Sequence, residues 1–268
     1  MAIITISRGS ASRGQEVAEL VAKKLGYACI SREIILDASE QFNIPEVKLT
    51  RAIHDAPSIL ERFTYGKEKY VAFFQATLLK FLRDDNAVYH GLAGQFLLPN
   101  IGHVLKVRMI ADMDNRVRLE MERGGMNYQD ALHQLKKDDE QRRKWSQSLY
   151  GFDSADPSLY DLVIHKQKIT VEDAADIICY TVSREAFQTT AESRKAIQDL
   201  SLAAEIRAAL VNLNPSVEVS ANDGKVEILA KIPVPDMAST EDLKRKALAI
   251  RGVREVEVRM EATPRFTD

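Results

Sequence analysis

Over the first 183 residues, short apolar runs alternate with segments whose apolar residues recur every three or four positions. The short runs predict buried strands, and the longer period predicts amphipathic helices between them. We expect strands within residues 3–6, 27–30, 86–90, 103–111 and 160–164. This alternation predicts an α/β fold in which a parallel five-stranded sheet is flanked by helices.

Residues 45–84 interrupt the alternation, because they contain no good strand pattern. A helical stripe is expected there from Val71, Phe74, Leu78, Leu79 and Leu82. A helical insertion between strands either closes over a ligand or simply covers the core. The pattern leaves both interpretations open.

The pattern changes again after residue 183. Residues 184–194 are polar without periodicity and are expected to form a linker. Residues 217–219 and 226–228 alternate around Asn222-Asp223-Gly224, which predicts a hairpin. With a helical pattern on either side and a further alternating strand, residues 195–262 are expected to form a small α-β-β-α-β domain.

Composition narrows the class of protein. The net charge of −2 gives no global basic field, so we expect no nucleic-acid partner. The sequence contains no run of 18 apolar residues, so no transmembrane segment is expected. The two cysteines lie far apart and no secretory signal opens the chain, so a cytoplasmic location is expected. The five histidines are scattered, and no metal ligand is assigned.

The first strand, turn and helix (residues 3–26) have the arrangement of a phosphate-binding site, because backbone N–H groups converge at a helix N-terminus. Gly9 and Gly14 have the spacing of the glycines in G-x-x-x-x-G-K-[ST]. However, Gln15 and Glu16 replace the lysine and the hydroxyl residue. The alternative is an ordinary helix start capped by Ser12. The candidate phosphate-binding residues are Arg8, Gly9, Ser10, Ala11, Ser12, Arg13, Gly14 and Gln15.

Several segments together resemble the cytidylate kinase-like family, a branch of the nucleoside monophosphate kinases with a P-loop kinase fold. The resemblance covers residues 1–183. It is carried by Ile4-Thr5-Ile6-Ser7-Arg8 with Gly14 and Glu16, by residues 32–36, by 107–111 followed by Arg116, by 137–142 with the lid pattern D-x-x-R, and by 160–164 and 169–174.

The resemblance implies an ATP-dependent kinase that transfers the γ-phosphate to CMP or a related small phosphate acceptor, with ATP and Mg²⁺ as cofactors. Arg32 and Gly91 would bind the acceptor, and Arg142 and Arg143 would act from the lid. Arg116, Asp139 and Arg142 would be catalytic, with Asp139 orienting Arg142 or helping to hold magnesium through water. Guanidinium groups suit these roles because they pair two phosphate oxygens at once.

Each assignment has a structural alternative. Arg32 could be a plain surface residue, Arg142 and Arg143 could form solvated helix pairs, and Arg116 could pair with Asp112 or Glu120 on its helix. The loop is poorer in glycine than the family pattern, and Leu92 replaces an expected arginine after Gly91. A nucleotide-binding or sensing module without turnover is therefore the rival function, and a non-catalytic scaffold is a third.

The tail, residues 195–262, resembles a BON domain, with the hairpin around Gly224 and Ile250-Arg251-Gly252-Val253 as its cue. The resemblance leaves open whether the tail binds a protein partner, packs on the kinase domain or supports a homo-oligomer.

Overall fold

The computed structural model describes residues 1–9, 11–31, 66–91, 93–232 and 237–262. The described chain forms two compact units. Residues 1–31 and 84–190 lie in the first unit, and residues 66–83 and 191–262 lie in the second. This division differs from the expected domains, because a segment between the second and third strands belongs to the second unit.

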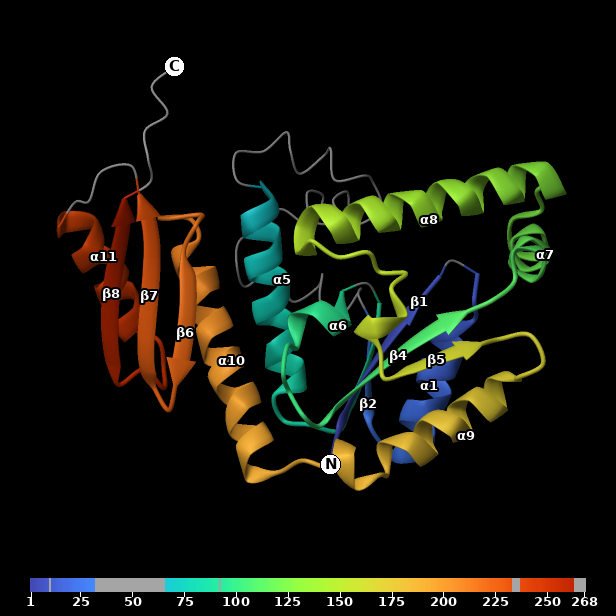
Figure 1. Ribbon diagram of the computed structural model, residues 1–268, viewed down its shortest axis with the longest axis horizontal. Helices are drawn as coiled ribbons and strands as arrows, with labels where there is room; N and C mark the ends of the chain where they lie inside the picture. Colours follow the sequence, from blue (N-terminus) through green and yellow to red (C-terminus); the bar gives the residue numbers. More distant parts are fainter. Residues whose placement is uncertain (10, 32–65, 92, 233–236, 263–268) are drawn as a thin grey trace, which may run out of the picture. The chain divides into compact units, whose positions relative to one another are not determined.

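The first unit contains the predicted parallel five-stranded sheet (Figure 1). Its strand order is β2-β3-β1-β4-β5, so the first strand lies in the middle. The strands are β1 (Ile3–Arg8), β2 (Ala28–Ser31), β3 (Ala87–His90), β4 (Val104–Ile110) and β5 (Leu162–His165). All four pairings are parallel, which confirms the fold expected from the alternating pattern.

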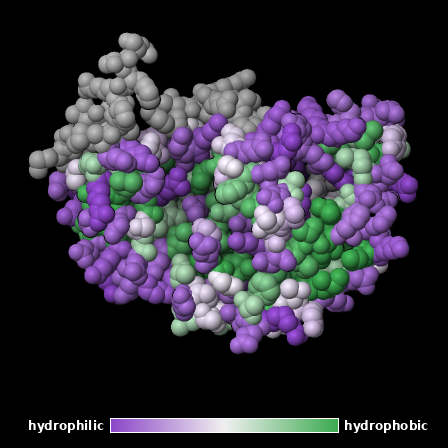
Figure 2. Space-filling view, in the orientation of Figure 1, coloured by the Kyte–Doolittle hydropathy of each residue, from purple (hydrophilic) through white to green (hydrophobic). Residues whose placement is uncertain are grey.

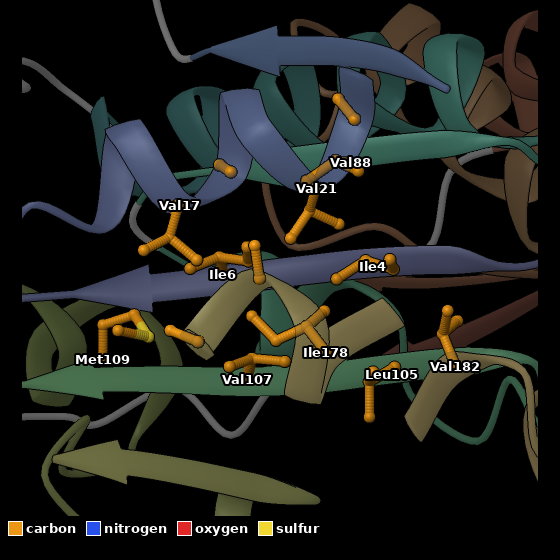
Figure 3. Packing of buried hydrophobic residues seen from close by; sticks show 14 of the residues in the cluster. Ile4, Ile6, Val17, Val21, Val88, Leu105, Val107, Met109, Ile178 and Val182 are labelled. Carbon is orange, nitrogen blue, oxygen red and sulfur yellow. The ribbon is translucent and has the colours of Figure 1, made fainter. Parts of the chain in front are cut away.

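One face of this sheet carries a hydrophobic core. Figure 3 shows Ile4 and Ile6 of β1 beside Val107 of β4, with Val17 and Ile178 reaching them from two helices. These helices are α1 (Gly14–Leu25) and α9 (Val171–Val182), which pack against each other. Because side chains alternate along a strand, the residues between these core positions point to the opposite face.

The opposite face therefore receives polar groups at the carboxyl ends of β1 and β4. Ser7 and Arg108 are register partners there. The other described helices of this unit are α6 (Gly94–Leu97), α7 (Met113–Gly124) and α8 (Tyr128–Tyr150), with single 3₁₀ turns at Pro157–Leu159 and Glu185–Phe187. Helices α1, α7 and α8 each end at a glycine of positive φ, as is common at helix C-termini.

The second unit contains the predicted α-β-β-α-β arrangement. Its elements are α10 (Ala191–Leu210), β6 (Glu218–Asn222), β7 (Lys225–Ile232), α11 (Met237–Leu248) and β8 (Glu255–Ala262). Strands β6 and β7 form the antiparallel hairpin, and β8 pairs with β7 in parallel. A separate hydrophobic core includes Ile206, Leu210, Val226, Ile228 and Leu243.

The expected helix in the inserted segment is α5 (Gly66–Leu82), and it belongs to the second unit. It packs along α10 (Figure 1). The remainder of the insertion lies outside the described residues. The chain expected as a linker, 184–194, contains a 3₁₀ turn and the first turn of α10. None of the described helices is long and apolar enough to cross a membrane.

Candidate functional site

The loop between β1 and α1 contains backbone N–H groups that make no hydrogen bond within the described chain. Within the described chain, the N–H groups of residues 11–16 have no protein acceptor. Ser12 is not the N-cap that the sequence suggests: its hydroxyl donates to the Gly9 carbonyl at 2.9 Å, and Arg13 occupies the N-cap position without a side-chain bond. The positive end of α1 is thus left open to an anion.

The loop adopts a shape that favours glycine, although it contains few. Ala11 and Arg13 have φ values of 53° and 56°, in the left-handed region where glycine is usually found. Gly14 cannot be replaced easily, because a Cβ there would lie 2.8 Å from the Cβ of Arg8. Two residues that carry a Cβ therefore hold a backbone conformation that glycine adopts at lower cost.

Arg116 of α7 lies over this loop. Its guanidinium is about 3.8 Å from the Cβ that a side chain at Gly9 would add. It donates to both carboxylate oxygens of Asp139 on α8, at 2.7 and 2.8 Å. The side chain of Arg116 is only 9% exposed, so Asp139 supplies the charge that allows its burial. The expected surface pair with Asp112 or Glu120 is not the arrangement found, since Asp112 contacts His165.

Arg142 reaches the same loop from α8. Its Nη1 donates to the Arg8 carbonyl at 2.8 Å. Asp139 was expected to orient Arg142 or to help hold magnesium through water, and in the structure both of its oxygens bind Arg116. The two residues lie three positions apart, so both side chains point from one face of α8 toward the loop. Asp139 therefore positions the arginine of the neighbouring helix.

The outer side of α8 is a solvated charged surface, as a mixed charge run usually is. Figure 2 shows hydrophilic residues covering this part of the molecule. Arg143 lies at the edge of that surface, where it donates to Glu140 at 2.8 Å, and its side chain is half exposed. Arg143 lines the cavity described next, but its charge already has a partner.

A cavity of about 460 Å³ lies between the loop, β4 and α8. Basic residues outnumber acidic ones in its lining, six to three. The basic residues are Arg8, Arg108, Arg116, Lys136, Arg142 and Arg143, and the acidic ones are Asp139, Glu140 and Asp153. A cavity with this balance favours an anionic ligand.

A second cavity, of about 300 Å³, lies on the other side of the loop. Ser12 lines both cavities. The second is also lined by Arg13, Asn115, Arg118, Lys166 and Gln167. Burial, assisted by the nearby Arg13, lowers the pKa of Lys166. The loop thus borders two cavities that a two-substrate reaction could use.

The positions that replace the usual loop cation point elsewhere. Gln15 donates to Glu19 one turn along α1, at 2.9 Å. Arg13 binds Glu16, and this hydrogen bond lowers the pKa of that carboxyl. Neither Gln15 nor Arg13 lines the first cavity. The loop therefore offers main-chain donors in place of a lysine.

The structure describes only one of the two residues predicted to bind the acceptor. Arg32, an expected acceptor-binding residue, lies outside the described residues, as does Ser10 of the candidate phosphate-binding loop. Gly91 follows β3, where a Cβ would lie 2.4 Å from the Tyr89 hydroxyl oxygen. Glycine is therefore needed at 91 to make room for the buried ring of Tyr89. Acceptor binding by Arg32 and Gly91 stays a prediction.

Four charged residues of the cavity lining had no site role assigned from the sequence: Arg108, Lys136, Glu140 and Asp153. Arg108 interrupts the apolar strand Val104–Ile110, and that interruption is the signal that could have found it. Lys136, Glu140 and Asp153 gave no such signal, because they lie within or just after a segment rich in charged residues.

Among the described residues, no group of three or more His, Cys, Asp and Glu side chains could hold a metal ion. Glu16 occupies the position of the usual magnesium hydroxyl and is paired with Arg13. Any metal at this loop would therefore depend mainly on oxygens of a bound phosphate and on water.

The strand order, the loop after the central strand and the open helix N-terminus together define a P-loop kinase fold. Residues 3–168 match the model of the cytidylate kinase-like family, and the chain belongs to this family.

Two relatives and one solved structure illustrate the similarity. The chain is 29% identical over 182 residues to a cytidylate kinase of Sulfolobus acidocaldarius, covering 68% of this chain and 94% of that protein. It is 32% identical over 116 residues to a cytidylate kinase of Pyrobaculum aerophilum, covering 39% and 62%. An uncharacterized protein from Eubacterium ventriosum shares the fold, with a TM-score of 0.54 and 22% identity over 69% of this chain and 100% of its own.

Proposed function

We propose that this protein transfers the γ-phosphate of ATP to CMP or a related small phosphate acceptor. The observation that carries the proposal is the set of unbonded N–H groups of residues 11–16 at the N-terminus of α1. They stand beside a cavity in which basic side chains predominate. Family membership, and the two relatives that are cytidylate kinases, support the same reaction.

In this proposal, the loop amides bind the donor phosphates, and Arg116 and Arg142 neutralise charge on the transferring group. Phosphoryl transfer requires mainly positioning and charge stabilisation, which these groups can supply. The donor would extend into the second cavity, and the acceptor would occupy the first. Magnesium, when bound, would be held mainly by phosphate oxygens and water and would supply positive charge that neutralises the phosphates.

The test is a coupled assay of ADP release with CMP, dCMP, UMP and AMP as acceptors. We expect ADP release above the blank with at least one acceptor, and strongly reduced release by Arg142→Met. If folded protein releases no ADP with any of the four, the proposed reaction is wrong.

A nucleotide-binding module without turnover is the second candidate, because Gln15 and Arg13 are paired away from the first cavity. Under either function, a lysine at position 15 should strengthen phosphate binding once its competing partner is removed. We expect Gln15→Lys with Glu19→Ala to lower the Kd for ATP several-fold, since hydrogen bonds to charged groups are strong. Gln15→Met with Glu19→Ala is the matched control. Weaker binding by the lysine variant would contradict this assignment of the loop.

We also propose that the tail is a BON-like module that communicates with a partner or with the nucleotide site. Its α-β-β-α-β element order supports the resemblance. The test compares Val226→Asp, which disrupts the core of the small sheet, with Glu227→Asp on its exposed face. A changed nucleotide affinity or oligomeric state in the first variant alone is expected. No change in either property would argue against such communication.

A further inference from the structure

We propose that Arg108 binds the phosphate group of the acceptor and makes the first cavity selective for a phosphorylated acceptor. The inference rests on the proposed function, because it assigns a residue to the acceptor side of that reaction. It concerns a residue inside the sheet, distinct from the loop and the lid arginines.

The strand fixes where Arg108 points. Its neighbours Val107 and Met109 are fully buried in the core on the α1 side of the sheet. Arg108 therefore projects from the opposite face, beside its register partner Ser7, and lines the first cavity. It is not among the described residues that line the second cavity. Arg108 therefore lies away from the second cavity, into which the proposed function extends the donor.

Neutral groups hold the guanidinium in position. One Nη donates to the Ser154 carbonyl, and the same nitrogen lies 3.3 Å from the Tyr160 hydroxyl. The guanidinium also lies over the Tyr160 ring, 5.5 Å from its centroid. Tyr160 is itself fixed, because its hydroxyl donates to the Ser154 carbonyl at 2.8 Å and accepts from Gln95 at 3.0 Å. Such support preorganises a side chain for binding.

No carboxylate balances the charge of Arg108 within the described chain. The nearby acids have other partners: Asp153 accepts from the Ala155 N–H, and Asp161 accepts from the Lys106 N–H. Arg116, Arg143 and Arg13, in contrast, each have an acidic partner.

Partly burying a cation costs free energy unless an anion compensates it. The remaining donors of this guanidinium are available in a fork that matches two phosphate oxygens. A phosphate on the acceptor would supply the missing anion. A dianionic monophosphate therefore fits this position better than an uncharged nucleoside.

The test measures the Kd of CMP, cytidine and ATP with magnesium for the full chain by calorimetry. The variants are Arg108→Met, Arg108→Lys and the control Arg184→Met. Arg184 also lies over a tyrosine ring, that of Tyr180, at 4.0 Å, but outside both cavities. We expect Arg108→Met to weaken CMP about 10- to 100-fold, because charge-assisted hydrogen bonds are lost. Binding of cytidine and ATP should change by less than about threefold.

The proposal is supported if Arg108→Met loses the preference for CMP over cytidine while the control Arg184→Met keeps it. If the preference survives, or if all three ligands weaken together, Arg108 only holds the segment around Ser154 and the proposal is wrong. Should Arg108→Met fail to fold, Arg108→Lys is judged by the same preference, because it keeps the charge and loses the fork.

The outcome for Arg108 is separable from that for the reaction. A wild-type protein that binds CMP and ATP without releasing ADP would refute the reaction, while the CMP preference would still decide the role of Arg108. A wild-type protein that binds neither nucleotide would overturn both.

Discussion

Arg116 is buried beside the loop and depends on a single carboxylate for its charge balance. Asp139→Asn keeps the shape of that side chain and removes its charge. We expect the free energy of unfolding to fall by about 1–3 kcal/mol, because a buried cation loses its partner. Chemical denaturation measures the change.

Glu140→Gln provides the matched control for this pair. Its partner Arg143 is half exposed, so the expected loss is below about 0.5 kcal/mol. Equal effects of the two substitutions would contradict the assignment of Asp139 as the positioning residue for Arg116.

Arg13 tests the cost of the loop's backbone path. Its φ of 56° is unfavourable for any residue with a Cβ, and its exposed pair with Glu16 contributes little. We expect Arg13→Gly to be more stable than Arg13→Ala by about 1 kcal/mol, since both lose the pair and only glycine relieves the strain. Denaturation midpoints compare the two variants. If alanine proved the more stable, the left-handed conformation would be in doubt.

At this scale the sequence was informative about which residues gather, but less about which bind each other. The loop, Arg116, Asp139 and Arg142 do meet at one cavity. The pairing of Asp139 with Arg116 depends on how α7 and α8 pack, and helix spacing within one element cannot give it. Arg108 was missed because Lys106 and Arg108 both interrupt the apolar pattern of this strand, and the sequence does not show which of them lines a cavity.

Among the elements, α9 carries a complete capping box. The Thr170 hydroxyl accepts from the Asp173 N–H, and the Asp173 carboxylate accepts from the Thr170 N–H. The bond that the Thr170 N–H donates to this carboxylate, followed by one that the Thr170 hydroxyl donates to it, lowers the pKa of Asp173. A lowered folded-state pKa means that the stabilisation is present above the ordinary carboxyl range and is lost as the pH falls through the folded-state value.

We therefore expect the wild type to have a higher Tm than Asp173→Ala at pH 7, and this advantage to shrink as the pH falls below about 4. Thermal melting from pH 7 to pH 3 measures it. Glu172→Ala is the control, because Glu172 lies in the same turn outside the capping box. An Asp173 advantage that persisted unchanged in acid would show that the box contributes through something other than the ionised carboxylate.

Element positions were well predicted because each strand and helix has its own apolar period. The strand at residues 103–111 and the hairpin around Gly224 both appear close to their predicted bounds. Glycine follows the last turn of α1 and of α7, at Gly26 and Gly125, and such a glycine is a signal that a sequence gives directly. The loop before α1 was harder, since Arg13 takes a conformation for which its residue type gives no signal.

For the whole molecule, the structure assigns α5 to the second unit although it lies in sequence between two strands of the first. Ile206→Ala creates a cavity in the core of the second unit and should cost about 2–5 kcal/mol there. We expect it to increase amide hydrogen exchange in α5 more than in β1 or β4. Val107→Ala, in the sheet core, should have the opposite pattern.

Mass spectrometry of exchange at peptide resolution distinguishes the two patterns. If Ile206→Ala left α5 as protected as in the wild type, the assignment of α5 to the second unit would be wrong. Sequence alone could not place this helix, because its apolar stripe shows that it is covered without showing by what.

The pairing of α5 with α10 bears on how this chain behaves when it is cut. A protease that nicks the backbone near residues 184–190 would leave α5 on the amino-terminal fragment and α10 on the carboxyl-terminal one. The two pieces would then share a helix–helix seam instead of separating as two lobes. We therefore expect the two fragments to co-purify after cleavage. We also expect two separately expressed halves to reassemble.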